Sequence, residues 1–237
     1  MNVDATNKFQ EQLSSYEGIA DSIVALLRRC DALAVSDAAT PWDAYLRLSH
    51  QIHESYEIPS TTITPIMRRL LFALGFAARP SHVVGVGTFV GYAISWVLRD
   101  RSDNEAAPFV NYALGADIDH EANEVARRNC AILGHGNRLT FQDCDGITIV
   151  GSYCFPIDLL YLDLDDPATG KAGYRKVAEA AMPRLTNGSV ILAHDVCVPR
   201  FRSDIEAFHG FLLHTGRFVG PWVLPVDDCG LSVSVVR

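Results

Sequence analysis

A short β-branched segment that runs into closely spaced glycines constrains the fold of this chain more than any other feature. Residues 82–86 read His-Val-Val-Gly-Val, and Gly87 and Gly91 follow before an apolar segment that suits a helix. A buried parallel strand that turns into a helix through glycines leaves its backbone open to a ligand at the helix N-terminus. The pattern predicts a strand–turn–helix unit of a parallel α/β sheet. A tight turn that binds no ligand is the alternative interpretation.

The spacing of the glycines indicates which ligand such a turn would bind. A dinucleotide-binding fingerprint needs its third glycine at position 90, where this chain has Val90. The arrangement Gly85-x-Gly87-x-x-x-Gly91 resembles instead the turn that binds S-adenosylmethionine (SAM) in class I methyltransferases.

Strand and helix patterns alternate after this turn and predict the fold class. Five strand patterns that precede helical patterns predict a doubly wound, Rossmann-like α/β sheet with right-handed crossovers. Two further strand patterns around the turn Asp227–Gly230 predict an antiparallel edge pair, which makes seven strands. The predicted strands are 82–87, 110–117, 138–142, 157–163, 188–194, 217–225 and 230–236, and the helices among them are 90–101, 120–134, 172–185 and 201–213.

The first 56 residues carry helical patterns without strands. We expect helices at 8–30 and 41–56, the second with Thr40 as N-cap and Pro41 as first residue. Pro- and Thr-rich residues 57–65 predict a loop, and a further helix follows at 65–76. We therefore interpret residues 1–56 as an N-terminal helical cap on a single domain at 57–237.

Charge and composition exclude several classes of partner. The net charge is -8 and no basic run occurs, so neither nucleic acid nor an anionic membrane is expected to bind. The chain shows no signal peptide and no apolar stretch of transmembrane length, and its six cysteines form no C-x-x-C pair. We expect a cytoplasmic protein with reduced cysteines and a small-molecule substrate; a homodimer is left open.

Three motifs, in order, support a resemblance to a known family. The segments Ile58–Leu71, Gly87–Ala93 and Leu224–Leu231 resemble the loop and helix before the SAM turn, the turn itself and the closing hairpin of the small O-methyltransferases of the catechol and caffeoyl-CoA type. The similarity covers roughly residues 57–237. The resemblance implies a class I methyltransferase fold with SAM as its cofactor.

Acidic residues at the ends of the predicted strands are candidates for binding this cofactor. Asp117 ends the second strand, where a carboxylate can accept both ribose hydroxyls. The nearby Asp119 suits the N-cap of the helix that begins at 120. Asp143 stands where the family holds the adenine amine, although a solvated turn carboxylate is the alternative. The candidate cofactor-binding set is Thr62, Gly85, Gly87, Thr88, Gly91, Tyr92, Asp117, Ile118, Asp143, Cys144 and Asp163.

The ends of the fourth and fifth predicted strands carry the candidate reaction centre. Asp163 closes an apolar strand, and His194 and Asp195 close the next, at the edge of the sheet where open α/β folds bind ligands. His194 is the expected general base, with Asp163 or Asp195 orienting it. Tyr174 completes the candidate catalytic set.

The match to the family fails at three positions. Its metal-dependent members bind a divalent cation with an Asp after the fourth strand and an Asp-Asn pair after the fifth, but Val196 stands in place of that Asn. Asp166 replaces a lysine that some members use as base and begins an insertion that ends at Lys171. Gly85 replaces an acid near the methionyl end of the cofactor. We therefore expect no metal site.

Three functions remain open. The first is SAM-dependent methylation of a hydroxyl or amine on a small molecule without metal. The second is a SAM-consuming cyclisation, in which the methionyl amine attacks its own γ-carbon and yields azetidine-2-carboxylate and methylthioadenosine. The third is a non-catalytic SAM-binding protein.

Overall fold

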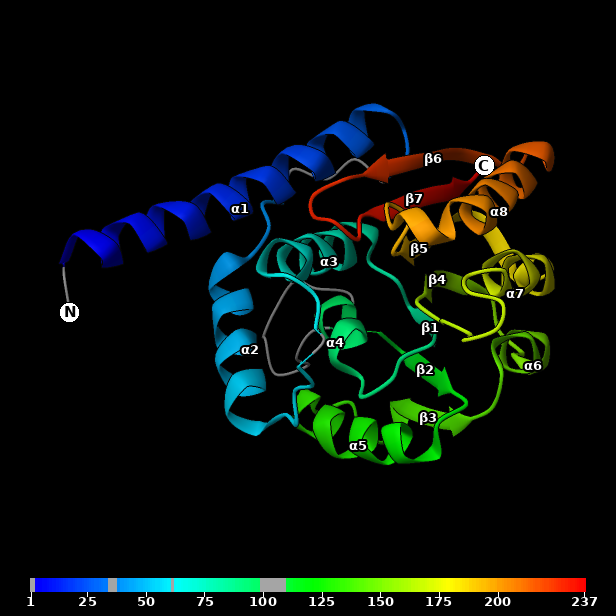
Figure 1. Cartoon of the computed structure of the whole chain (residues 1–237), viewed down its shortest axis with the longest axis horizontal. Helices are drawn as coiled ribbons and strands as arrows, with labels where there is room; N and C mark the ends of the chain where they lie inside the picture. Colours follow the sequence, from blue (N-terminus) through cyan, green and yellow to red (C-terminus); the bar gives the residue numbers. More distant parts are fainter. Residues whose placement is uncertain (1–2, 34–37, 61, 99–109) are drawn as a thin grey trace.

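A seven-stranded sheet forms the centre of the molecule, with the strands in the order β3-β2-β1-β4-β5-β7-β6 (Figure 1). The computed structural model describes residues 3–33, 38–60, 62–98 and 110–237, with side chains from Ser15 onward. Strands β1 to β5 run parallel to one another, and β7 is antiparallel to both β5 and β6. The strands are β1 His82–Val86, β2 Tyr112–Asp117, β3 Leu139–Asp143, β4 Ile157–Leu162, β5 Leu185–His194, β6 Phe218–Leu224 and β7 Leu231–Val236.

Helices cover both faces of the sheet (Figure 1). One face packs against α1 to α5 and the other against α6 to α8, and each face has its own hydrophobic core. The strands alternate their side chains between these cores, as buried parallel strands do. The helices are α1 Val3–Arg29, α2 Trp42–Ser55, α3 Pro65–Ala78, α4 Tyr92–Leu98, α5 His120–Cys130, α6 Gly146–Ser152, α7 Gly173–Ala181 and α8 Arg202–His214.

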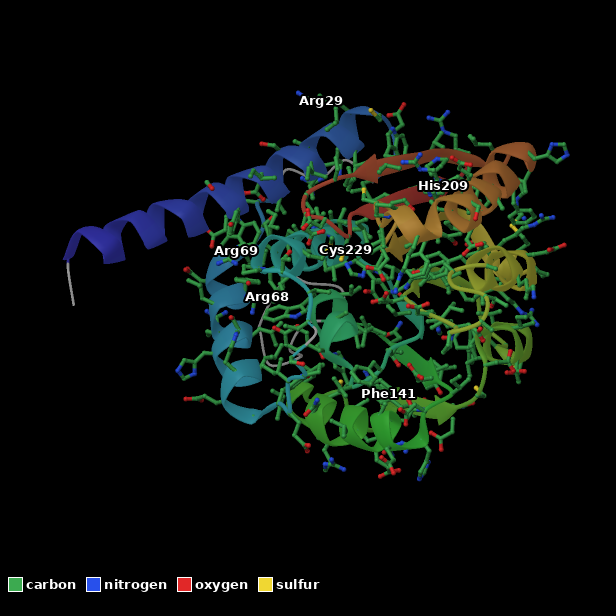
Figure 2. All side chains as sticks on the ribbon, viewed as in Figure 1. Arg29, Arg68, Arg69, Phe141, His209 and Cys229 are labelled. Carbon is green, nitrogen blue, oxygen red and sulfur yellow. The ribbon has the colours of Figure 1, made fainter. Side chains whose placement is uncertain are left out.

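The N-terminal helices share the core of the sheet. Leu27 of α1 and Tyr45 of α2 are both 1% exposed and belong to the same cluster as Phe72 of α3. Arg69 of α3 donates to the Tyr45 hydroxyl at 3.0 Å, and Figure 2 shows Arg68 and Arg69 beside α2. The predicted helical cap is thus packed directly on the sheet domain.

The predicted start of α2 is wrong by one residue. Pro41 is the N-cap and the helix begins at Trp42, without a side-chain capping bond. The Thr40 hydroxyl instead donates to Asp21 of α1 at 2.6 Å, and the Trp42 indole donates to the same carboxylate at 3.0 Å. The Thr40 hydroxyl, which the local pattern predicted to cap α2, therefore forms a tertiary contact with α1 instead.

The predicted fold class is confirmed, including the antiparallel edge pair. The sequence missed α6, which Asp145 caps by accepting from the backbone N–H groups of Ile147 and Thr148 at 2.9 and 3.0 Å. The predicted helix 90–101 is described as far as Leu98, and its last residues lie outside the described ranges. Among the described residues, no helix has the length and apolar character needed to cross a membrane.

Candidate active site at the carboxyl ends of the strands

The turn between β1 and α4 brings the backbone of the sheet close to the segment after β4. Gly87 has a φ of +74°, and a Cβ there would collide with the backbone of Asp163 and Leu164. Only glycine combines this left-handed conformation with so close an approach. Gly87 therefore fixes the distance between the turn and the end of β4.

A cavity of about 380 Å³ lies on one side of this turn, at the carboxyl ends of β1, β2 and β4. Five of the predicted cofactor-binding residues line it: Gly87, Asp117, Ile118, Cys144 and Asp163. Ile118 is 73% exposed and offers an apolar surface to the cavity. The volume of this cavity is in the range of small-molecule sites.

A smaller cavity of about 80 Å³ lies on the other side of the turn. Thr62, Thr88 and Tyr92, all predicted to bind the cofactor, line it. Gly87, Phe89 and Asp163 line both cavities. The two spaces therefore adjoin at Asp163 and the glycine turn.

Asp117 faces the larger cavity in the position predicted for a ribose ligand. Its carboxylate accepts the backbone N–H of Phe89 at 2.9 Å and that of Asp119 at 3.0 Å. These bonds fix the carboxylate beside the turn. Asp119 caps α5 by accepting from Ala122 N at 3.1 Å, as its alternative interpretation predicted.

Three predicted cofactor residues do not line either cavity. Asp143 accepts hydrogen bonds from His120 and Asn123 of α5 at 2.6 and 2.8 Å, so its carboxylate is directed at that helix. A Cβ at Gly91 would collide with Cys130 and crowd Ala126 of α5. The space above Gly85 is filled by Ile94 and Thr88, whose Oγ1 has no partner among the described residues.

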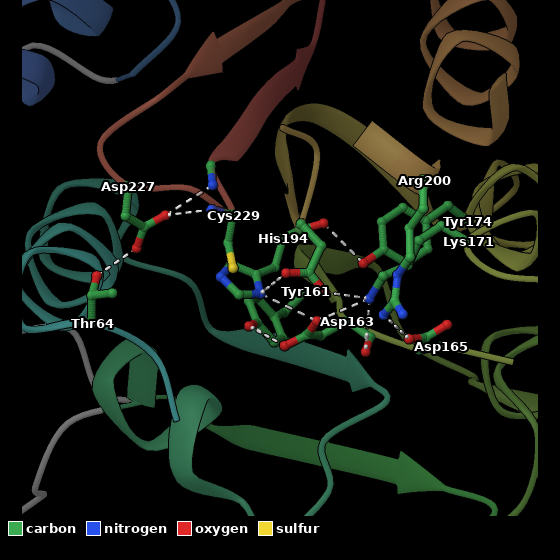
Figure 3. A network of polar contacts seen from close by, with 12 residues as sticks. Thr64, Tyr161, Asp163, Asp165, Lys171, Tyr174, His194, Arg200, Asp227 and Cys229 are labelled. Carbon is green, nitrogen blue, oxygen red and sulfur yellow. Dashed lines mark hydrogen bonds and ion pairs between the residues drawn. The ribbon is translucent and has the colours of Figure 1, made fainter. Parts of the chain in front are cut away.

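The predicted catalytic residues converge at the ends of β4 and β5 (Figure 3). His194 Nδ1 lies 3.3 Å from both Asp163 Oδ1 and Asp195 Oδ1. The Tyr161 hydroxyl donates to Asp163 Oδ2 at 3.0 Å. Tyr174 is fully buried and donates to the backbone carbonyl of His194 at 3.0 Å, so it supports β5 and not the cavity. Of these residues, only Asp163 lines the cavities.

A residue that sequence reasoning missed completes this cluster. Lys171 Nζ lies 3.2 Å from Asp163 Oδ1 and 2.9 Å from Asp195 Oδ2, and its side chain is 1% exposed. It comes from the end of the insertion, which folds back because Asp166 and Gly170 exchange backbone hydrogen bonds at 3.0 and 2.7 Å. The signal was available in the sequence: Lys171 ends an insertion that follows the strand-end acid, and the chain has only three lysines.

The surroundings keep the Asp163 carboxylate charged. Burial alone would raise the pKa of Asp163, but His194 and Lys171 lower this pKa below its ordinary value. Burial alone would lower the pKa of His194, but Asp163 and Asp195 raise it above its ordinary value. Burial, helped by Asp163, raises the pKa of Tyr161 well above its ordinary value, so its hydroxyl remains a donor.

The ligand-type side chains at this point are engaged with partners from the chain itself. His194, Asp195 and Cys229 bring ligand-type atoms within 4.8 Å of one another. Burial, together with Asp195, raises the pKa of the Cys229 thiol to about 12. The carboxylates themselves already hold an ammonium, and Val196 offers no side-chain oxygen.

Solved structures of SAM-dependent enzymes share this fold. No protein-family profile matches the chain, and no curated protein is significantly similar in sequence. An O-methyltransferase from Bacillus cereus in complex with SAH superposes with a TM-score of 0.62 at 16% identity, over 90% of this chain and 97% of that one. The O-methyltransferase TomG from Streptomyces achromogenes, involved in tomaymycin synthesis and in complex with SAM, gives 0.64 at 15% identity, over 94% and 98%. An SAH-bound methyltransferase from Podospora anserina gives 0.60 at 14% identity, over 86% and 100%. At these identities the likeness establishes the fold.

Proposed function

We propose that this chain binds SAM and transfers its methyl group to a hydroxyl or amine of a small molecule, without a divalent metal. The observation that carries the proposal is that two adjoining cavities share Gly87, Phe89 and Asp163 in their walls. The bound cofactors of the structural neighbours, SAH and SAM, support the choice of ligand. When bound, SAM supplies a methyl group on a cationic sulfur.

The larger cavity offers groups that fit a nucleoside. Asp117 presents a carboxylate for two hydroxyls, and the exposed Ile118 presents an apolar surface for a base. The smaller cavity, with Thr62 and Tyr92, is left for the methionyl end. In this arrangement Asp143 supports α5 and leaves recognition of the base to other groups.

Asp163 is the group that reaches both spaces, and we assign it the central role. A carboxylate kept ionised by Lys171 and His194 can hold the cationic end of the cofactor in line with an acceptor. His194 is nearly buried behind it, and the free position of its imidazole, Nε2, has no partner among the described residues. We infer that His194 positions Asp163, in place of the direct base role predicted from the sequence.

The experiment that tests the proposal incubates the protein with SAM alone and with a panel of phenols, alcohols and amines. Methyl transfer predicts S-adenosylhomocysteine and a methylated product only when an acceptor is present. Methylthioadenosine formed from SAM alone would replace this proposal with the cyclisation. If calorimetry shows that SAM binds but neither product forms, the chain is a non-catalytic SAM-binding protein. If SAM does not bind, methyl transfer, cyclisation and SAM binding are all refuted.

A further inference from the structure

Lys171 places a positive charge where two carboxylates from adjacent strand ends converge. We propose that Lys171 Nζ is the resident cation of this site and holds Asp163 and Asp195 where a divalent metal would otherwise bridge them. The inference deepens the proposed function, on which its catalytic meaning rests. The charge itself can be tested without SAM or an acceptor.

The contacts of Lys171 show a built site. Its Nζ has three acceptors, namely Asp163 Oδ1 at 3.2 Å, Asp195 Oδ2 at 2.9 Å and the Asp163 carbonyl at 3.5 Å. The rings of Tyr174 and Phe201 lie 5.2 and 5.4 Å from the ammonium, within the range of a cation–π contact. All three ammonium donors are therefore directed at the protein.

The backbone around Lys171 leaves little freedom for its side chain to swing into solvent. Asp204 of α8 accepts the Lys171 N–H at 3.1 Å. Gly170, with φ +57°, lies so close that a Cβ there would be 2.8 Å from the Asp204 carboxylate. The insertion, α7 and α8 thus enclose the lysine from three sides.

A cation of this kind changes how an acceptor must be held. A metal ion with open positions can bind an acceptor oxygen directly. The donors of Lys171 are already engaged, and the residue is 1% exposed. The acceptor must therefore be oriented by the cavity walls, so a single nucleophilic atom suffices and a chelating pair of hydroxyls is not required.

The test measures Mn²⁺ binding to chelator-treated full-length protein by calorimetry. Lys171→Ala removes the ammonium and leaves two adjacent carboxylates, so it should gain one Mn²⁺ site, at least about tenfold tighter than any site in the wild-type chain. Adding Asp195→Asn to this variant should abolish the new site. The exposed Lys176→Ala on α7, the helix that follows Lys171, is the matched control and should bind Mn²⁺ as the wild type does.

Two results would overturn the proposal. One is a folded Lys171→Ala that binds Mn²⁺ no better than the wild type, with Lys171→Gln, which keeps more of the side-chain volume, behaving likewise. The other is a wild-type chain that binds Mn²⁺ in a site lost with Asp195→Asn. Should both lysine variants unfold, Mn²⁺ must restore folding; failure to do so also contradicts the proposal. None of these measurements uses SAM, so their outcome is independent of whether the proposed function is correct.

Discussion

Asp117 is committed to the glycine turn before any ligand binds, because its two oxygens accept from Phe89 N and Asp119 N. A ribose would share a carboxylate that is already oriented. Asp117→Ala should therefore weaken SAM binding by about 1.5–3 kcal/mol, as expected when a charge-assisted bond is removed. Calorimetry measures the change. Asp119→Asn keeps a capping oxygen and removes a neighbouring charge, so an equal loss in that control would attribute the effect to charge alone.

Asp163 gathers three donors, from Lys171, His194 and Tyr161, and Asn at this position would turn an amide toward at least one of them. Asp163→Asn should fold, yet reduce methyl-transfer turnover by roughly 10²-fold or more. Steady-state kinetics and circular dichroism together test this. Asp158→Asn, at the opposite end of the same strand, should keep its turnover; a folded Asp163→Asn with wild-type turnover would place the reaction centre elsewhere.

Single residues also show what the sequence could and could not predict. The placement of Asp117, Asp163 and His194 at one edge of the sheet could be predicted because the carboxyl ends of parallel strands share that edge, a rule that needs only the strand pattern. Lys171 was missed because its contact with Asp195 depends on how the insertion folds back. The hydrogen bonds that Asp143 accepts from helix α5 could not be predicted, because local spacing does not show them.

Among the elements, the start of α3 is tied to the turn between β6 and β7. Thr64 caps α3 by accepting from Met67 N at 3.3 Å, and its hydroxyl donates to Asp227 (Figure 3). Asp227 in turn accepts the N–H groups of Cys229 and Gly230 at 3.1 and 2.9 Å. One hydroxyl thus joins a helix cap to the edge hairpin.

Thr64→Val should lower the free energy of unfolding by about 1–2 kcal/mol, since it removes both the cap and the bond to Asp227. Urea denaturation gives this value. Thr64→Ser keeps the hydroxyl and should remain within about 0.5 kcal/mol of the wild type. A loss in the serine variant as large as that in the valine variant would show that the methyl group, and not the hydroxyl, matters.

The strands and their order followed from the sequence, whereas several boundaries did not: the helix predicted at 172–185 ends at Ala181, and β5 begins at Leu185 and not at residue 188. The seven strands were predicted because each contains a short apolar pattern bounded by turn residues. Helix α6 was missed because Gly146–Ser152 is only seven residues long and rich in β-branched side chains, which indicate strand as readily as helix. Its cap by Asp145 is the local feature that decides the helix.

At the scale of the whole molecule, α1 and α2 belong to the same core as the sheet. Leu27→Ala removes a side chain that is 1% exposed, so it should reduce stability by about 2–5 kcal/mol. Because the core is continuous, the thermal transition should shift as a whole. Calorimetry that showed two separate transitions would indicate that the N-terminal helices unfold independently. The exposed Leu46→Ala on α2 serves as the control.

The stability of the molecule should also depend on pH through His209 of α8. Burial lowers the pKa of His209 to about 4, against 6.5 for an ordinary histidine, so the folded state prefers the neutral ring. The unfolded chain binds the proton more readily, and the free energy of unfolding should fall by roughly 1–2 kcal/mol as the pH is lowered from 6.5 to about 4. Figure 2 shows this residue on α8.

His209→Leu should remove that part of the acid sensitivity, because no ring remains to be protonated. Denaturation midpoints of both proteins across this pH range provide the comparison. The exposed His214→Leu on the same helix should follow the wild-type curve. If His209→Leu followed that curve as well, burial of His209 would not be the cause.

The positive charge of a lysine side chain is part of the polypeptide and does not depend on the supply of a metal ion. A metal-dependent centre is assembled only after folding, and its occupancy follows the ion concentration of its surroundings. Lys171 arrives with the polypeptide, one per molecule, and reaches Asp163 and Asp195 when the insertion closes. For this molecule folding itself completes the site, so every folded copy carries the same charge whatever ions the solution contains.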